Sequence, residues 1–273
     1  MVKTWCGVGW LAMLAGGAWA AGARSDARPE TAAAQEPGAQ EPAAPQQSEL
    51  VALFAEQGVR LDLARREIAL QAKVCVLHEP LEYALVIQPQ GKDHESLLSC
   101  EGVAAEALNA AMLMLGVEQG RNGTIRAADP APTLEEIQNG AEPSVVEPAA
   151  GDGFYVYVSW EEEIAGRREP FVYRLEDLII NARTEGTYQR GKWVYLGSRF
   201  VKPHKDAPEL FAAQGEGNLV SLCIFEPANH LLTGADPDSD DEQIWYPNVF
   251  LLPPAGHPVT VTFAREARSG ALQ

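Results

Sequence analysis

Two short clusters of polar side chains are the parts of the chain that could carry chemistry. His94, Glu95 and Ser96 are consecutive, and a histidine next to a serine can serve as a base beside a nucleophile. The Gly-x-Ser-x-Gly turn of the α/β-hydrolases is absent, and the sequence identifies no third, orienting carboxylate. The cluster therefore leaves three interpretations open: support for the loop that leads into the following helix, ligand binding, or catalysis by His94, Glu95 and Ser96.

A second His-Glu pair raises the question of a metal site. Imidazole and thiolate groups suit zinc or iron, and Cys75 and Cys100 lie at the two ends of the same stretch. The spacing matches no zinc finger, and the His-Glu-x-x-His motif is missing. We therefore predict no cofactor and keep a metal as the minority alternative. The candidate ligands are His78, Glu79, His94 and Glu95.

The charge of the chain excludes one class of partner. The 273 residues include 21 Lys and Arg and 38 Asp and Glu, which gives a net charge of −17. Nucleic-acid phosphates would be repelled over most of such a surface, so we predict no nucleic-acid binding. The length suffices for one or two domains with a hydrophobic core.

Residues 1–20 have the order of parts found in a secretory signal peptide. Lys3 is followed by an apolar stretch over residues 8–19 and by a small-x-small cleavage site, Ala18-Trp19-Ala20. The stretch is shorter than the roughly 20 residues that span a bilayer. We expect a periplasmic or secreted protein without a stable membrane span after cleavage, and a retained anchor is the alternative.

Export would place the remaining cysteines in a compartment that permits disulfides. Cleavage leaves Cys75, Cys100 and Cys223. Three thiols allow at most one disulfide within the chain, and the sequence does not choose the pair. The alternative is that all three are buried apolar side chains.

The predicted organisation has a tether before the folded part. Residues 21–48 consist largely of Ala, Pro, Gln, Glu and Gly, a composition that buries too little apolar surface to fold. Residues 49–273 form the predicted domain. Within it, residues 117–153 are punctuated by Gly and Pro and mark a surface excursion or a module boundary, with one helical turn at 133–139 that has capping-box spacing.

Periodicity predicts a short helix at 49–57, a β-hairpin from strands 59–63 and 68–76, and a strand at 83–88. Residues 103–115 are apolar on nearly all sides, which is typical of a buried helix. A second hairpin is expected from strands 154–160 and 171–175 with a charged turn at 161–168. Further strands are predicted at 192–201, 219–225, 244–251 and 259–263. Since no βαβ alternation is visible, we predict an α+β fold: a largely antiparallel β-sheet with one buried helix and short accessory helices.

Three segments together resemble a known family. They are Lys92-Asp93-His94-Glu95-Ser96-Leu97-Leu98, the helix from Ala107 to Gly116, and Trp193-Val194-Tyr195-Leu196-Gly197-Ser198-Arg199-Phe200. The chain resembles exported YdjY-domain proteins in their long, planctomycete-type form, over roughly residues 58–263. The resemblance implies export and one shared architecture, and it implies no reaction mechanism.

The sequence thus predicts an exported, acidic, soluble protein whose biochemical activity it does not reveal. The leading hypothesis is a non-catalytic envelope module that binds an unknown envelope protein or a small ligand, through the β-sheet or through His94-Glu95-Ser96. The alternative is a hydrolase or a metal-dependent enzyme that uses the same three residues. Whether the protein is an enzyme therefore stays open at this point.

Overall fold

The computed structural model describes residues 44–268, with side chains from Ser48 onward. The predicted signal peptide at 1–20 and most of the predicted linker at 21–48 lie outside this range. The described residues belong to one compact unit, which begins at Pro42.

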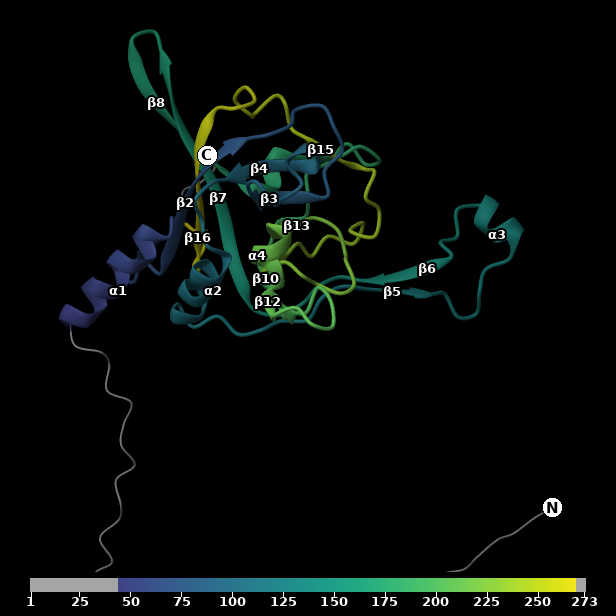
Figure 1. Ribbon diagram of the computed structural model, residues 1–273. Helices are drawn as coiled ribbons and strands as arrows, with labels where there is room; N and C mark the ends of the chain where they lie inside the picture. The colour runs from purple at the N-terminus through teal and green to yellow at the C-terminus, as the bar shows by residue number, and fades with distance from the viewer. Residues whose placement is uncertain (1–43, 269–273) are drawn as a thin grey trace, which may run out of the picture. The chain divides into compact units, whose positions relative to one another are not determined.

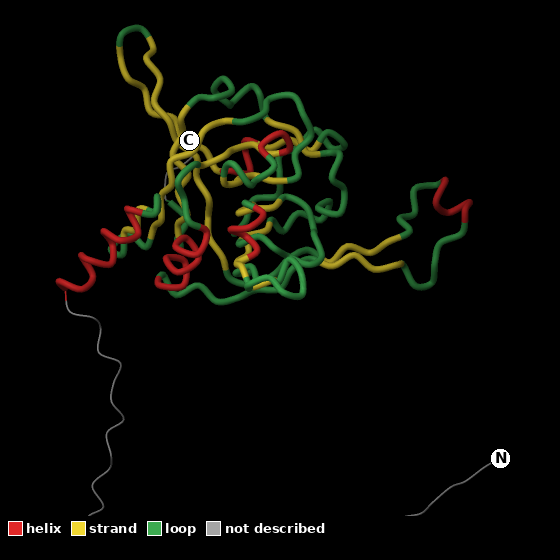
Figure 2. Tube along the Cα trace, viewed as in Figure 1, coloured by secondary structure: helices red, strands yellow, loops and turns green. Residues whose placement is uncertain are grey.

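The centre of the molecule is a closed β-barrel (Figure 1, Figure 2). Eight strands form the ring, and the pairing of β2 with β4 closes it. Two more strands extend the wall: β1 (Arg60–Asp62) pairs with β2, and β8 (Arg167–Arg174) pairs with β7. In ring order the eight strands are β2 (Glu67–Val74), β16 (Pro258–Ala264), β7 (Gly153–Ile164), β10 (Trp193–Tyr195), β14 (Leu232–Thr233), β13 (Asn218–Ser221), β3 (Tyr83–Ile87) and β4 (Ser96–Cys100).

The barrel is mixed in strand direction. β3 runs parallel to β4, and β13 runs parallel to β14, whereas the other neighbours in the ring are antiparallel. Parallel neighbours are usually joined by a helical crossover of a dozen or more residues. Here the links are the shorter segments 88–95 and 222–231, which contain no α-helix. They leave no βαβ pattern in the sequence.

The predicted fold class is therefore wrong. A largely antiparallel sheet with one buried helix was expected, and a closed mixed barrel is observed. Alternation within a strand shows which face is buried, but it does not identify the neighbouring strand or its direction. Closure also removes the sheet edges that an open sheet would need to protect.

The barrel interior is filled by alternate residues of its strands. In β2, Ile68, Leu70 and Val74 are almost completely buried while Gln71 between them is exposed. Phe154 on β7 and Phe263 on the neighbouring strand β16 meet edge to face, with ring centres 6.4 Å apart. The period-2 pattern that predicted the first hairpin is confirmed by the pairing of β1 with β2.

The helices lie outside the barrel (Figure 2). They are α1 (Ala44–Glu56), α2 (Ala105–Met114), α3 (Leu134–Gln138) and α4 (Ala212–Glu216), with 3₁₀ turns η1 (Asp93–Glu95) and η2 (Leu175–Leu178). Gly58 follows α1 with φ +76°, and a Cβ there would lie 2.6 Å from the carbonyl oxygen of Gly102. The chain therefore needs glycine at this turn.

The helix predicted at 103–115 exists as α2, but it is not buried on all sides. Leu108, Ala111 and Met112 join the core, whereas Leu113 is 52% exposed and Met114 is 39% exposed. The expectation of a buried helix is wrong because the barrel fills its own interior with strand side chains. The helix therefore only covers the barrel from outside, with one face in water.

Two β-hairpins project from the barrel in different directions (Figure 1). The first consists of β7 and β8, which pair from Tyr157 and Arg174 out to Ile164 and Arg167. The charged segment 161–168 was predicted as a turn, and most of it is strand. Both faces of this part lie outside the barrel, so charged side chains remain in water on either side.

The second projection is a hairpin with a small helix at its end, and we call residues 124–147 the arm. Its strands are β5 (Thr124–Ala127) and β6 (Ser144–Glu147), and α3 lies between them. The predicted capping box is confirmed: the Thr133 side chain accepts from the Glu136 N–H, and the Glu136 carboxylate accepts from the Thr133 N–H. The remaining small ribbons pair β9 (Ile179–Asn181) with β15 (Trp245–Pro247) and β11 (Phe200–Val201) with β12 (Leu210–Phe211).

Candidate functional site

His94 lies on an exposed turn and is not oriented by a partner. The turn η1 connects β3 to β4, and the His94 side chain is 72% exposed. Its Nδ1 is 3.9 Å from Asp93 Oδ1, and its Nε2 is 3.8 Å from Glu95 Oε1. Both distances exceed hydrogen-bond length, so neither carboxylate fixes the imidazole as an orienting group would.

Ser96 is turned away from solvent at the start of β4. It is completely buried, and its Oγ donates to the carbonyl oxygen of Lys92 at 2.5 Å. A nucleophilic serine needs a base within hydrogen-bond reach and an approach for the substrate. Ser96 has neither, so the structure does not bring His94 and Ser96 together as a catalytic pair.

Glu95 belongs to an ion-pair cluster that holds this turn in place. Lys92 Nζ lies 2.9 Å from Glu95 Oε2 and 2.7 Å from Glu82 Oε2. The hydrogen bond from Lys92 lowers the pKa of Glu95, whereas burial raises the pKa of Glu82 despite the same lysine. The arrangement holds the link between β3 and β4, whereas the supporting role considered from the sequence concerned the loop that leads into α2.

The predicted metal ligands are not gathered into a site. His78 and Glu79 are exposed on the loop between β2 and β3, away from any hydrogen bond or ion pair of the described chain. His94 instead lines a shallow hollow of about 400 Å³ with Asp93, Cys75 and Lys73. Over residues 44–268, no three His, Cys, Asp or Glu side chains are close enough to hold a metal ion.

The three cysteines of the described chain are free thiols. Burial raises the pKa of the partly buried Cys75, and it raises the pKa of Cys100 to about 12. The buried Cys223 is shifted in the same direction by the same cause. A reactive cysteine needs a lowered thiol pKa, so none of the three has the environment of a nucleophile.

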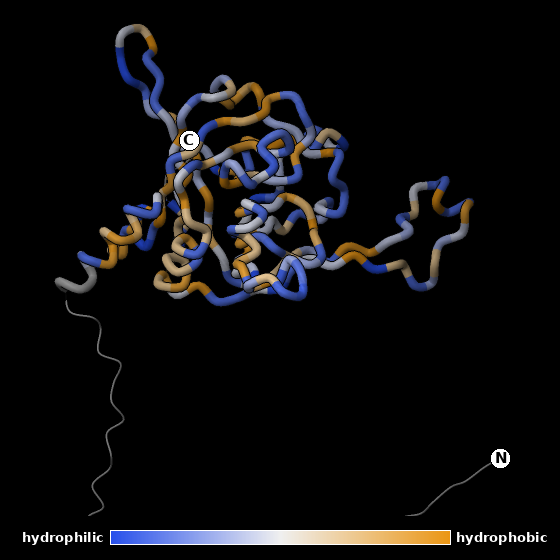
Figure 3. Tube along the Cα trace, in the orientation of Figure 1, coloured by the Kyte–Doolittle hydropathy of each residue, from blue (hydrophilic) through white to orange (hydrophobic). Residues whose placement is uncertain are grey.

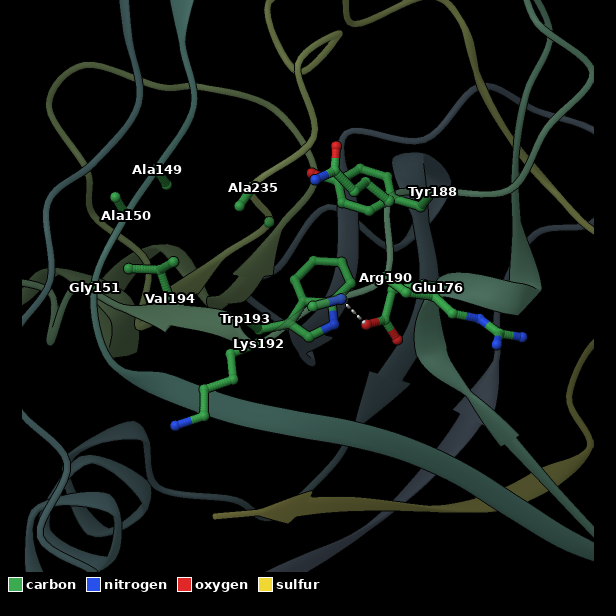
Figure 4. A pocket seen from close by; sticks show the side chains of 13 residues that line it. Ala149, Ala150, Gly151, Glu176, Tyr188, Arg190, Lys192, Trp193, Val194 and Ala235 are labelled. Carbon is green, nitrogen blue, oxygen red and sulfur yellow. Dashed lines mark hydrogen bonds between the residues drawn. The ribbon is translucent and has the colours of Figure 1, made fainter. Parts of the chain in front are cut away.

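A small cavity of about 180 Å³, partly open to solvent, lies at the end of β10 (Figure 4). Tyr188 and Trp193 stack beside it with ring centres 5.2 Å apart, and the indole Nε1 of Trp193 is buried without a hydrogen-bond partner. Small side chains form much of the remaining wall: Ala149, Ala150, Gly151, Gly234 and Ala235.

The charged groups around this cavity are all paired. Glu176 is 1% exposed, and its carboxylate accepts from Arg174 and from the Gly191 N–H. Arg190 binds Asp177 at 2.6 Å, and Lys192 binds Asp152 at 2.9 Å. In Figure 4 the charged ends of Arg190 and Lys192 extend away from the aromatic pair. The cavity can hold water or a very small polar molecule, but it presents no acid, base or nucleophile.

Exposed apolar side chains mark a different candidate site, on the arm. Leu134 is 79% exposed, Ile125 48%, Ile137 39% and Val145 36%. Figure 3 shows apolar stretches along both strands of the arm and at its far end. An apolar surface that is left uncovered and rimmed by polar residues indicates a contact site for a partner. The arm is therefore the strongest functional feature of the described chain.

Sequence reasoning missed this site. The segment 117–153 was recognised as a surface excursion, but its apolar residues are few and lie between Gly and Pro. Ile125 and Val146 face each other across the two strands, and only that pairing shows that they share one surface. The two adjacent valines, Val145 and Val146, were the one available signal.

The described helices include none that is both long and apolar enough to cross a membrane.

A comparison with curated proteins and a comparison with solved structures gave no match. A family model described as the YdjY domain matches residues 59–264. The match runs from the residue before β1 to the last residue of β16, so it covers the whole barrel, the arm and the β7–β8 hairpin. The chain belongs to the YdjY domain family.

Proposed function

We propose that this protein is an exported, non-catalytic interaction module that contacts a protein partner through the arm. The observation that carries the proposal is a projecting hairpin with four large exposed apolar side chains, whose outer residues 128–143 make no hydrogen bond or ion pair with the rest of the described chain. This observation favours the arm over the barrel wall and over the turn with His94 as the contact surface.

The outer part of the arm is not held by polar contacts with the rest of the described chain. Among the described residues, 128–143 form no hydrogen bond, ion pair or ring contact with any residue outside the arm. A two-stranded hairpin in water is only marginally stable unless one face is covered. A partner that covers Ile125, Leu134 and Ile137 would supply the missing burial, at roughly 25 cal/mol per Å² of apolar surface.

The environment of the polar candidates supports a non-catalytic role. Ser96 is buried against the backbone, the cysteine pKa values are raised, and the carboxylate of Glu176 is fully paired. An acyl-transfer or hydrolytic enzyme needs a nucleophile and a base that meet in an accessible pocket. The described residues do not offer such a pair.

The proposed location is the periplasm or the medium. It rests on the signal-like residues 1–20, which lie outside the described range. Sequencing the amino terminus of the protein from the envelope and secreted fractions tests it: we expect Ala21 as the first residue. An intact leader in cytoplasmic protein would contradict this part of the proposal.

Site-specific photocrosslinking in the producing cell tests the arm. A photoreactive amino acid replaces Leu134 at the end of the arm, and in a matched variant it replaces Glu163, which is exposed near the end of the other hairpin. We expect a discrete crosslinked product from position 134 and none from position 163. Equal labelling at both positions, or no product at position 134, would overturn the proposal.

A further inference from the structure

The far end of the arm combines apolar side chains with one sign of charge. Residues 128–143 contain Asp129, Glu135, Glu136 and Glu142 and no Lys, Arg or His. None of these four carboxylates takes part in an ion pair of the described chain. Leu134 and Ile137 lie among them on α3. The partner surface therefore has to combine an exposed apolar group with several cations.

The ribbon of β11 and β12 has the complementary composition, and we call residues 199–211 the basic flap. Besides three cations the flap contains two acidic residues, Asp206 and Glu209, so its formal charge is +1, and Glu209 lies 3.8 Å from Lys202 with both side chains more than half exposed. Arg199, Lys202 and Lys205 lie within seven consecutive residues, in a chain whose net charge is −17. Between them, Phe200 is 67% exposed and leans on Phe211, with ring centres 5.4 Å apart. An accessible aromatic ring thus lies within two positions of Arg199 and Lys202 along the chain.

We infer that the arm of one copy docks on the basic flap of a second copy of this chain. This rests on the proposed function and names its partner. Leu134 and Ile137 would cover Phe200, while Glu135 and Glu142 would face Lys202 and Lys205. The arm forms no hydrogen bond or ion pair with the flap of its own chain among the described residues, so neither surface covers the other within one molecule.

Charge complementarity favours this contact over the other exposed aromatic residue. Phe250 is 89% exposed, more than Phe200, but no basic residue lies within six positions of it along the chain. At physiological ionic strength, charges about 8 Å apart or more are largely screened. The overall negative charge then opposes association weakly, whereas the close pairs between arm and flap persist.

Charge reversal tests the inference on the full chain, purified as the cell produces it. Sedimentation equilibrium of the wild type should show association at about 100 µM protein and physiological ionic strength. Glu135→Lys with Glu142→Lys on the arm, or Lys202→Glu with Lys205→Glu on the flap, should each weaken association about tenfold or more. All four changes in one chain, or a 1:1 mixture of the two double variants, should restore it.

The apolar part of the contact has a matched control. Phe200→Ser should weaken association, whereas Phe250→Ser should leave it unchanged although it removes the more exposed ring. Circular dichroism of every variant should stay unchanged, because all of these positions are exposed.

The outcomes separate this inference from the proposed function. A wild type that stays monomeric, an equal loss with Phe250→Ser, or the absence of charge rescue would overturn self-docking. If photocrosslinking at Leu134 then captures a different protein, the proposed function stands and this inference fails. If position 134 captures nothing, both fail.

Discussion

The two projecting hairpins of this barrel differ in how each is attached and in what its end exposes. The β7–β8 hairpin continues the barrel wall, and Trp160 stacks on Phe171 and Tyr173 with ring centres 5.6 Å and 5.5 Å away. Beyond this stack, Glu161 pairs across the ribbon with Pro170, and Glu163 with Arg168. The base of this hairpin is packed, and its end carries charged side chains beside one exposed apolar residue, Ile164, which is 47% exposed.

The arm has the opposite distribution. The four residue pairs between β5 and β6 contain no aromatic residue, and the end of the arm is apolar and acidic. At its base, the Asn122 side-chain amide donates a hydrogen bond to the carbonyl oxygen of Phe225. Charge and proline along an exposed strand prevent unwanted pairing with other chains, and the β7–β8 hairpin has both. The arm lacks proline in its strands and leaves apolar side chains in water. Both hairpins expose apolar side chains, since Ile164 and Val172 of the β7–β8 hairpin are 47% and 38% exposed, but the arm exposes more of them and has no packed aromatic base.

The largest expected effect comes from removing the aromatic base of the β7–β8 hairpin. Trp160 is 6% exposed, and replacing it with Ala should lower the free energy of unfolding by about 3–5 kcal/mol, because a buried indole leaves a cavity. Urea denaturation followed by circular dichroism measures the loss. A loss below about 1 kcal/mol would mean that the stack does not anchor the hairpin.

A smaller loss is expected at Asp152, which lies just before β7 and joins the barrel to the segment that follows α2. Its carboxylate accepts from Arg265, from Lys192 and from the N–H groups of Gly153 and Glu118. Asp152→Asn should lower the free energy of unfolding by about 1–3 kcal/mol at pH 7, because Arg265 loses its charged partner.

The dependence of this effect on pH follows from the pKa of Asp152. Burial acts to raise that pKa, but the bonds from Arg265, Lys192 and the backbone outweigh it, so the folded-state pKa is lowered. A lowered carboxyl pKa stabilises the fold above the ordinary value and loses this contribution as the pH falls below it. The difference between wild type and Asp152→Asn should therefore shrink in acid, and a constant difference would contradict the ion-pair explanation.

His230 should make the stability of the barrel, from which both hairpins project, depend on pH. It is 2% exposed in the loop between β13 and β14, and burial lowers its pKa to about 4. A lowered histidine pKa costs stability as the pH falls below 6.5, since the unfolded chain then binds the proton more readily. From pH 7 to pH 5 the wild type should lose about 1–2 kcal/mol through this residue.

His230→Phe is the matched variant for this measurement. It keeps an aromatic ring beside Phe225, whose ring centre lies 6.4 Å from that of His230, and it removes the titrating group. The slope of stability against pH between 7 and 5 should flatten in the variant, measured by urea denaturation at each pH. An unchanged slope would show that His230 is not the group that responds.

The same comparison shows what the sequence could and could not predict. The first hairpin and the Thr133–Glu136 capping box were predictable because both are local patterns with one physical cause each. Barrel closure was not predictable, because it depends on β2 meeting β4 at Lys73 and Ser99, and on two parallel pairs with no helical crossover. The family resemblance was recognisable from local segments, whereas the position of Ser96 against the Lys92 carbonyl required the folded turn.

The smallest effect on stability is expected at the end of the arm. It tests most directly whether the arm differs from the packed base of the β7–β8 hairpin. Leu134 is as apolar as many core residues, yet 79% of it is exposed. Leu134→Ser should therefore change the free energy of unfolding by no more than about 0.5 kcal/mol, as for other surface positions. The same substitution should abolish the contact made by the arm, measured as the loss of the product that a photoreactive group at Ile137 forms in the cell. A large loss of stability would instead mean that Leu134 packs within its own chain, and the contrast with Trp160 would disappear.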